Sequence, residues 1–334
     1  MTFPFIESSL SFVDFSGRWV FSPDRAEACV PACGFHFHFK GSSAYAKIKG
    51  KARWKLIIDG TRESELNTEE EGYYGLASGL TFGEHYVELW KKTESQESPV
   101  TLFSTGSKDG QLSKVKSSEF FPLKIEFIGD SYTVGYGNEA KNPYEGDPFS
   151  TTDATQSYAF LAAKELRADF QVNAYSGKGI VKNFEGNDPH WTIRELYRYS
   201  LGSLAPQGKM SVWDLNCWHP DVICIFAGIN DFQGEGPHPT PEKFDFAYKS
   251  FLETLRMAHH QPKFILISTR IYPDDLLSER IEAITEKELS EGLSGFSHLF
   301  MNTDENSGLC FHPGLNRHKK MARILLDEIK KISL

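Results

Sequence analysis

The chain lacks long apolar runs, an excess of positive charge and a dense set of cysteines. No apolar segment reaches the ~20 residues that a membrane-spanning helix requires, which argues against a membrane protein. The formal net charge of −9 disfavours strong non-specific binding to nucleic acid or to an anionic membrane. With 334 residues, the chain is long enough for two domains that each have a core.

The few cysteines suggest no disulfide framework. There are five, an odd number, and none forms a CxxC pair, so we expect free thiols in a reducing compartment. A Cys29–Cys33 disulfide, or a zinc site made by these cysteines with His36 and His38, is an alternative. The alternation of phenylalanine and histidine over 35–39 explains the histidines more simply, because it predicts a strand that buries three phenylalanines on its other face.

Residues 1–120 have the pattern of an all-β domain. Short alternating runs are separated by segments rich in turn-forming residues, and the clearest predicted strands are 35–40, 44–49, 54–59, 85–92 and 100–105. Many short strands with regular turns are typical of a β-sandwich, here expected to be of the jelly-roll type.

Residues 121–334 change to an alternation of strand-like and helical segments. The expected strands are 123–128, 170–175, 222–226, 264–268 and 299–302, and the expected helices are 158–166, 244–259 and 318–332. This order predicts a three-layer α/β domain with a parallel sheet between helices. Ligands bind such domains at the carboxyl ends of the strands.

Two polar motifs directly follow predicted strands, and a third lies near the end of the chain. They are Gly129-Asp130-Ser131, Gly228-Ile229-Asn230-Asp231 and His312-Pro313. A serine hydroxyl becomes a nucleophile when a base takes its proton, and Ser131 and His312 can meet in the fold despite their distance in sequence.

The second motif offers two further functions. Asn230 can present its amide to an ester oxygen, and Asp231 can hold its loop by accepting backbone N–H bonds. Each motif taken alone also suits a plain structural role, with Ser131 as a helix cap and Asn230 in a turn.

Together, these motifs resemble the conserved blocks of the SGNH (GDSL-type) hydrolases. The whole chain is similar to carbohydrate esterase family 2, the two-domain acetyl esterases of plant polysaccharides, in which a β-jelly-roll precedes the SGNH domain. The segments that carry this resemblance are Ile58-Asp59-Gly60, 83–89, Gly135-Tyr136-Gly137-Asn138, 176–183, Trp213-Asp214 and Asn230-Asp231-Phe232.

The resemblance implies roles for four residues, with a fifth as an alternative for one of them. Ser131 matches the nucleophile and His312 the base. The oxyanion hole is expected to consist of the backbone N–H groups of Ser131 and Gly177 with the Asn230 amide, and Gly179 is a close second for the glycine. No metal and no cofactor is expected.

One position departs from the family pattern. SGNH hydrolases usually carry an aspartate two or three residues before the histidine, where this chain has Cys310 and Leu309. Neither side chain can orient an imidazole as a carboxylate does. We expect a backbone carbonyl to do so, in a Ser–His dyad, and the alternative is Asp304 or Glu305 folding back.

The predicted activity is hydrolysis of O-acetyl groups on an acetylated saccharide of the xylan type. Trp191, Trp213, Trp218 and Phe232 are candidates for stacking on sugar rings. The alternatives are a carbohydrate-binding protein with a degenerate hydrolase domain and an esterase for other short-chain esters. Neither nucleic acid nor a membrane is expected as a partner, and a homo-oligomer is left open.

The predicted location follows from the start of the chain. Residues 1–7 lack the basic and long apolar regions of a secretory signal peptide. We therefore expect a cytoplasmic protein that acts on imported oligosaccharides, or a secreted protein if a leader has been removed.

Overall fold

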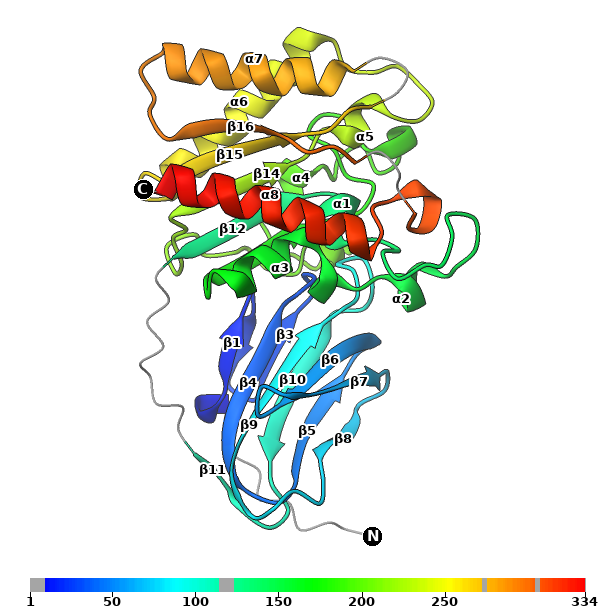
Figure 1. Cartoon of the computed structure of the whole chain (residues 1–334), viewed down its shortest axis with the longest axis vertical. Coiled ribbons are helices and arrows are strands. Elements are labelled where there is room, and N and C mark those ends of the chain that lie inside the picture. The colour runs from blue at the N-terminus through cyan, green and yellow to red at the C-terminus, as the bar shows by residue number, and fades with distance from the viewer. Residues whose placement is uncertain (1–9, 114–122, 272–274, 304–306, 334) are drawn as a thin grey trace.

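The computed structural model describes residues 10–113, 123–271, 275–303 and 307–333. Within them, an antiparallel β-sandwich is followed by an α/β domain, and Figure 1 shows the second stacked on one end of the first. The predicted fold class is confirmed. The predicted boundary at 120/121 lies outside the described residues and stays a prediction.

The sandwich consists of two antiparallel sheets. The first has the order β1-β4-β9-β6-β7, with β11 also paired to β4: β1 (Asp14–Ser16), β4 (Gly34–Gly41), β9 (Gly83–Lys91), β6 (Ala52–Ile58), β7 (Arg62–Thr68) and β11 (Gln111–Ser113). The second has the order β2-β3-β10-β5-β8: β2 (Val20–Ser22), β3 (Arg25–Ala28), β10 (Val100–Gly106), β5 (Ala44–Lys49) and β8 (Gly72–Ala77).

All five strands predicted for this domain are present, and the others were missed. The missed strands are short or, like β7, mostly exposed on both faces, so they carry little alternation to detect. Phe35, Phe37 and Phe39 are fully buried along β4, while His36 and His38 occupy its half-buried face, as the alternation predicted.

The α/β domain is built on a five-stranded parallel sheet. Its order is β13-β12-β14-β15-β16: β13 (Asp169–Ala174), β12 (Lys124–Gly129), β14 (Val222–Phe226), β15 (Lys263–Ser268) and β16 (Phe296–Phe300). The last strand begins three residues before the predicted 299–302, because the polar Ser297 and His298 hide the start of the apolar run.

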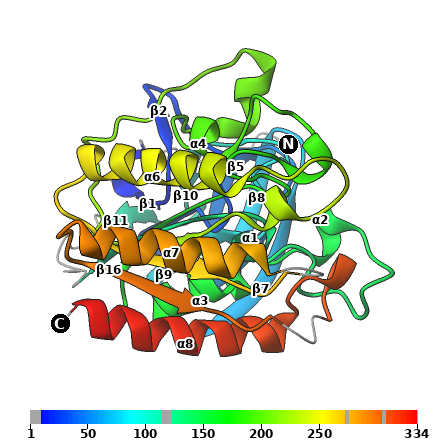
Figure 2. The same cartoon turned by 90° about the horizontal axis from the view of Figure 1, so that it is seen from above.

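Helices cover both faces of this sheet. Figure 2 shows α6 (Pro241–Ala258) and α7 (Leu276–Ser290) on one side and α8 (Leu315–Ser333) on the other, where α8 packs with α3 (Tyr158–Glu165). The three predicted helices are confirmed to within a few residues, whereas α7 was missed. The shorter elements are α1 (Ser131–Val134), α2 (Pro148–Thr151), α4 (Ile193–Leu196), α5 (Ile229–Phe232), and the 3-10 turns η1 (Leu10–Phe12), η2 (Ala154–Gln156), η3 (Phe184–Gly186), η4 (Gly202–Gln207) and η5 (Leu309–Phe311).

Buried ionic contacts join the two domains. Arg18, between β1 and β2, inserts into the α/β domain and donates to Glu126 at 2.9 Å and to Gln171 at 3.1 Å. Arg53 of β6 pairs with Glu139 of the second domain at 2.8 Å. Because Arg18 and Glu126 are each only 1% exposed, the ion pair is desolvated, and the domains form one packed unit.

Three further findings concern the thiols, possible metal ligands and membrane-spanning helices. All five cysteines are free thiols, with Cys29 and Cys33 buried. No three His, Cys, Asp or Glu side chains of the described ranges are grouped so that they could hold a metal ion. Among the helices in the described part of the chain, none has the length and apolar character needed to cross a bilayer.

Candidate active site

The three predicted motifs converge at the carboxyl edge of the sheet. In the register of the neighbouring strands, Gly129 at the end of β12 pairs with Ala174 on β13 and with Phe226 on β14. The chain segments after these strands therefore begin side by side. They carry Ser131, Gly177 and Asn230, respectively.

Gly129 and Asp130 shape the turn that presents Ser131. A Cβ on Gly129 would collide with the Thr133 side chain and lie 2.6 Å from the Phe226 carbonyl oxygen, so only glycine fits. Asp130 caps α1, and its carboxylate accepts from the Tyr132 N–H at 3.1 Å. Ser131 is thus the first residue of a helix, where its backbone N–H has no partner within the helix.

Ser131 and His312 lie within hydrogen-bonding distance. The Nε2 atom of His312 is 2.9 Å from Oγ of Ser131. This is the separation at which an imidazole can take the proton of a serine hydroxyl. The rings of Tyr132 and Tyr136 pack against the imidazole, with centroids 5.3 and 4.7 Å away.

A backbone carbonyl occupies the far side of the imidazole. Nδ1 of His312 is 2.9 Å from the Leu309 carbonyl oxygen. Cys310 and Phe311, between them, have φ values of 51° and 61°, a left-handed turn that brings this carbonyl back toward His312. Asp304 and Glu305, the alternative partners, lie outside the described residues.

The loop that carries this carbonyl is hydrogen-bonded to the segment that follows α1. The Leu309 N–H donates to the Gly137 carbonyl at 3.0 Å, and the Cys310 N–H donates to the Pro143 carbonyl at 2.8 Å. Gly137 belongs to the Gly135-Tyr136-Gly137-Asn138 block of the sequence. That block therefore supports the histidine loop, a role that its pattern did not indicate.

His312 is held in the neutral form. Burial lowers the pKa of its imidazole to about 4, although bonds to the Leu309 and Cys310 backbone oppose this shift. With the proton on Nδ1 directed at the Leu309 carbonyl, the lone pair of Nε2 faces the Ser131 hydroxyl. This tautomer is the one that a general base requires.

The candidate oxyanion donors surround Ser131. Gly177 lines the same cavity, and no described residue accepts a hydrogen bond from its N–H. Gly179 was the second choice for this donor, but its N–H donates to Oδ1 of Asn183 at 3.1 Å, and it does not line the cavity. Gly179 is therefore not available to a substrate.

Asn230 also lines the cavity, and its amide is already engaged. Its Nδ2 atom donates to the Lys178 carbonyl at 2.9 Å and, over a longer 3.3 Å, to the Asp130 carboxylate. A primary amide has two N–H groups. The hydrogen directed at Asp130 is the more weakly bound and is the one that can turn to a substrate oxygen.

Asp231 holds the loop after β13. Its buried carboxylate accepts from the N–H groups of Ile180, Val181 and Lys182 at 2.8, 2.6 and 2.9 Å. The expectation that Asp231 binds backbone N–H groups is met, but the loop that it holds is the one carrying Gly177. Burial raises the pKa of Asp231 to about 6 and that of Asp130 to about 7.

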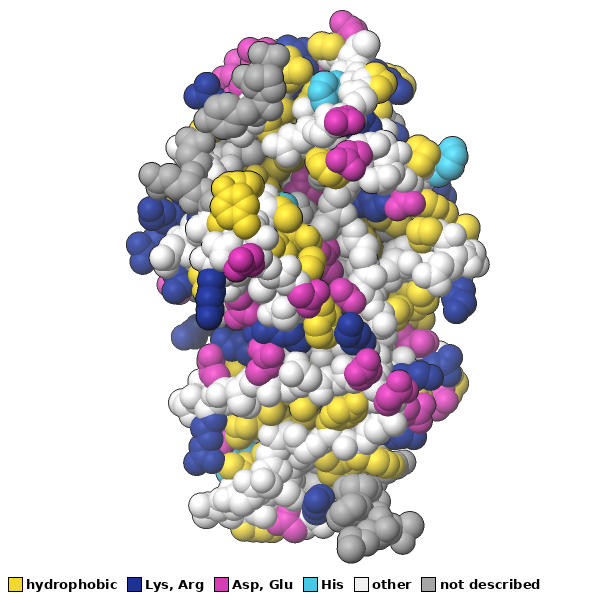
Figure 3. All heavy atoms as spheres, turned by 90° about the vertical axis from the view of Figure 1, so that its right-hand side faces the viewer, with side chains coloured by type: hydrophobic (Ala, Val, Ile, Leu, Met, Phe, Trp, Pro, Cys, Tyr) yellow, Lys and Arg dark blue, Asp and Glu magenta, His cyan; other side chains and the backbone are white. Residues whose placement is uncertain are grey.

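The cavity around Ser131 has a volume of about 520 Å³ and is partly lined by aromatic rings. Its aromatic lining residues are Tyr132, Tyr136, Phe184 and Phe311. The carboxyl edge of the sheet faces the viewer in Figure 3, where hydrophobic side chains gather above a band of Lys, Arg, Asp and Glu between the domains.

The aromatic residues chosen from the sequence do not line this cavity, and their contact with a sugar stays a prediction. Phe232 is buried against Phe244, 4.9 Å between ring centroids, and Trp191 packs on Tyr199. Trp213 lies over the Arg18 guanidinium, and Trp218 donates to Asp169. None of the four, all described residues, lines the cavity. Ring type alone does not indicate on which side of a loop a side chain lies.

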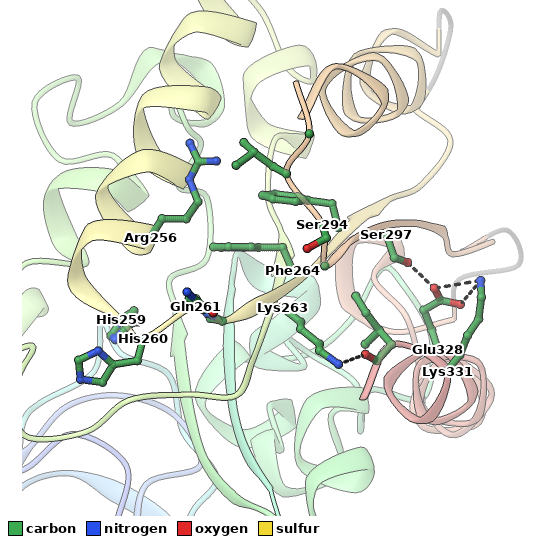
Figure 4. A pocket seen from close by; sticks show the side chains of 16 residues that line it. Arg256, His259, His260, Gln261, Lys263, Phe264, Ser294, Ser297, Glu328 and Lys331 are labelled. Carbon is green, nitrogen blue, oxygen red and sulfur yellow. Dashed lines mark hydrogen bonds and ion pairs between the residues drawn. The ribbon is translucent and has the colours of Figure 1, made fainter. Parts of the chain in front are cut away.

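A larger cavity, of about 980 Å³, lies at the opposite edge of the sheet. Figure 4 shows Glu328 in contact with both Lys331 and Ser297, and Lys263 donates to the backbone carbonyl of Ile332. Since no serine that lines this cavity contacts a histidine, it is not a comparable site.

A second histidine close to the site, His318, has a structural role. His318 is fully buried on α8, where its Nδ1 accepts from the Tyr158 N–H at 3.1 Å and its ring stacks on Tyr158. Burial lowers the pKa of His318 to about 3. It therefore serves as a neutral packing group beneath the site.

A serine paired with an imidazole after the first strand of a parallel sheet, facing glycine and asparagine donors, defines a serine hydrolase of the SGNH (GDSL) class. Residues 15–114 match the family described as "Carbohydrate esterase 2 N-terminal", and residues 127–291 match the "GDSL-like Lipase/Acylhydrolase family". The chain therefore carries the N-terminal domain of carbohydrate esterase family 2 followed by a GDSL-type domain, and it is a carboxylic ester hydrolase.

Individual relatives agree with this assignment. An "Acetylxylan esterase / glucomannan deacetylase" of Cellvibrio japonicus is 29% identical over 90% of this chain and 84% of its own length. The "Cellulase/esterase CelE" of Acetivibrio thermocellus is 29% identical, and the match spans 95% of this chain but 39% of CelE. A solved family two carbohydrate esterase from Clostridium thermocellum, in complex with cellohexaose, has a TM-score of 0.88 at 26% identity, covering 96% of this chain and 98% of that one.

Proposed function

We propose that this protein removes O-acetyl groups from plant polysaccharides or oligosaccharides of the xylan type, using a Ser131–His312 dyad. One observation carries the proposal. His312 contacts Ser131 Oγ through Nε2 and the Leu309 carbonyl through Nδ1, both at 2.9 Å. The carbonyl thus takes the place of the missing aspartate in selecting the tautomer.

The reaction proceeds through an acetyl-enzyme. Ser131 Oγ attacks the acetyl carbonyl carbon while His312 Nε2 takes the hydroxyl proton. The tetrahedral oxyanion accepts hydrogen bonds from the N–H groups of Ser131 and Gly177 and from the Asn230 amide. His312 then protonates the departing sugar oxygen, and it activates a water that hydrolyses the acetyl-enzyme and releases acetate.

A saccharide substrate is supported by both the relatives and the cavity. A relative named for acetylxylan and glucomannan deacetylation aligns with 90% of this chain. The exposed Phe311 and the Tyr136 ring offer apolar faces beside Ser131, and sugar rings bind aromatic faces through apolar contact.

A binding protein with a degenerate hydrolase domain is the competing proposal. The missing aspartate was the feature that favoured it, and a carbonyl at the Nδ1 position removes that reason. Acetate release from acetylated xylan and from an aryl acetate tests the choice.

We expect Ser131→Ala to abolish both activities, with the exposed Ser98→Ala as the matched control at full rate. Equal turnover by Ser131→Ala and the wild type would overturn the nucleophile. Absence of acetate release from every acetylated saccharide, with aryl acetate still cleaved through Ser131, would overturn the carbohydrate substrate alone.

A further inference from the structure

A segment of the sandwich domain reaches the loop that forms the oxyanion hole. It follows β9 and covers residues 92–97. The fully buried Lys91 fixes its shape, because its Nζ donates to the carbonyls of Cys29, Thr93 and Glu94 at 3.1, 2.8 and 2.6 Å. The start of the segment is therefore anchored to the sandwich.

Side chains of this segment hold the chain just before Gly177, and Glu94, Ser95 and Gln96 all contribute. Ser95 Oγ donates to the Ala174 carbonyl at 2.6 Å, at the end of β13. Gln96 Nε2 donates to the Ser176 carbonyl, also at 2.6 Å. No other donor among the described residues reaches the Ser176 carbonyl.

The Ser176 carbonyl is linked covalently to an expected donor of the oxyanion hole, the Gly177 N–H. It belongs to the same planar peptide unit as the Gly177 N–H, and in a trans peptide these two groups point in opposite directions. A donor that holds the carbonyl on one side therefore sets the direction of the N–H on the other. Gly177 has a φ of 73°. Glycine adopts positive and negative φ about equally readily, so the residue by itself does little to fix the orientation of this peptide unit.

We propose that Gln96, with Ser95 beside it, is a positioning residue of the esterase, which aims the Gly177 N–H at the oxyanion through the Ser176 carbonyl. The proposal rests on the proposed function and extends it. The β-sandwich then contributes to the oxyanion hole indirectly, by orienting a peptide unit of the other domain without contacting the substrate.

The contact is not required to hold the domains together. Arg18 is buried against Glu126, and Arg53 and Lys92 pair with Glu139, so the interface has ion pairs that are independent of Gln96. Gln96 itself is exposed. Its loss is expected to affect the peptide that it holds more than the stability of the protein.

Three variants of the full chain separate these roles. Gln96→Leu removes the donor at similar size, Gln96→Lys keeps a donor on a long side chain, and Gln111→Leu changes an exposed glutamine on β11 as the matched control. The measurements are kcat and KM for an aryl acetate, the Ki of a boronic acid that forms a tetrahedral adduct with Ser131, and the Tm.

For Gln96→Leu, we expect kcat to fall about tenfold, less than the ~10²–10³ for loss of an oxyanion donor itself. KM and Tm stay near the wild-type values, and the boronic acid binds about tenfold more weakly, because its adduct uses the same donors. In Gln96→Lys, kcat and the affinity for the boronic acid stay much closer to the wild-type values than in Gln96→Leu. In Gln111→Leu, neither changes. Ser95→Ala gives a second measurement, with a loss in the same direction.

Wild-type kcat and Ki in Gln96→Leu would overturn the positioning role while leaving the esterase assignment intact. A fall in kcat with unchanged affinity for the boronic acid would overturn it too, since the oxyanion hole would be intact. If the wild-type chain itself shows no Ser131-dependent esterase activity, the proposed function and this proposal both fail.

Discussion

The pH dependence of catalysis is the prediction that tests the environment of His312 most directly. Burial lowers the pKa of this imidazole from 6.5 to about 4, and a general base works only when it is unprotonated. At pH 5.5, an imidazole with a pKa of about 4 is roughly 97% neutral, whereas one with a pKa of 6.5 is roughly 9% neutral. We therefore expect about tenfold more activity at pH 5.5 than an ordinary histidine base would allow.

The assay is kcat/KM for an aryl acetate from pH 4 to 8, because that parameter reports the ionisation of the free enzyme. The folded pKa of His312 lies below its ordinary value, so the folded state loses stability as pH falls from about 6.5 toward 4. Thermal unfolding measured at each pH separates this loss from the titration of the base.

Asp130 is a second group whose titration can appear in the pH profile, so the Asp130→Asn variant is measured beside the wild type. Burial raises its pKa to about 7, and its carboxylate contacts the Asn230 amide, so it also can shape the profile near neutrality. An acid limb near pH 7 that moves to about 4 in Asp130→Asn would belong to Asp130. Because burial also raises the pKa of Asp231 to about 6, a limb centred near 6.5 would refute the low pKa of His312 if it persisted in Asp130→Asn and in Asp231→Asn.

Three further predictions concern single contacts. Asn230→Ala is expected to lower kcat by ~10²–10³ with little change in KM, and a proportional rise in KM would contradict its place in the oxyanion hole. Cys310→Asp, which restores the usual carboxylate position, is expected to change kcat/KM by less than about tenfold, because the Leu309 carbonyl already accepts the Nδ1 proton; a gain of about a hundredfold would show that this carbonyl is a poor partner. Arg18→Met strands a buried carboxylate and is expected to lower the free energy of unfolding by about 3–5 kcal/mol in denaturant titrations, whereas the exposed Arg25→Met has almost no effect.

Much of the fold was predictable because its signals are local. The alternation over 35–39 and the apolar runs before Ser131 and Asn230 report strand burial directly. The β7 strand escaped because its mostly exposed side chains, Arg62–Thr68, carry no clear period. The α7 helix escaped because its apolar residues gather less clearly on one face than those of α6 and α8.

The site was predictable in its side chains and unpredictable in its surroundings. The types of Ser131, His312 and Asn230 indicate the chemistry, and the tertiary structure brings these residues to one cavity. The aromatic lining of this cavity was not anticipated, because Phe184 and Phe311 come from loops without a clear pattern, while Phe232 and the tryptophans contact other elements.

The amino-acid sequence alone therefore determined the order of the domains, the alternation of strands and helices and the identity of the reactive side chains. Only the tertiary structure decided which backbone groups serve them: the Leu309 carbonyl behind His312, the Gly177 N–H in place of that of Gly179, and the Ser176 carbonyl held by Gln96. The physical reason is that every peptide unit carries the same donor and acceptor. Their use depends on direction, which left-handed turns and contacts between distant segments set.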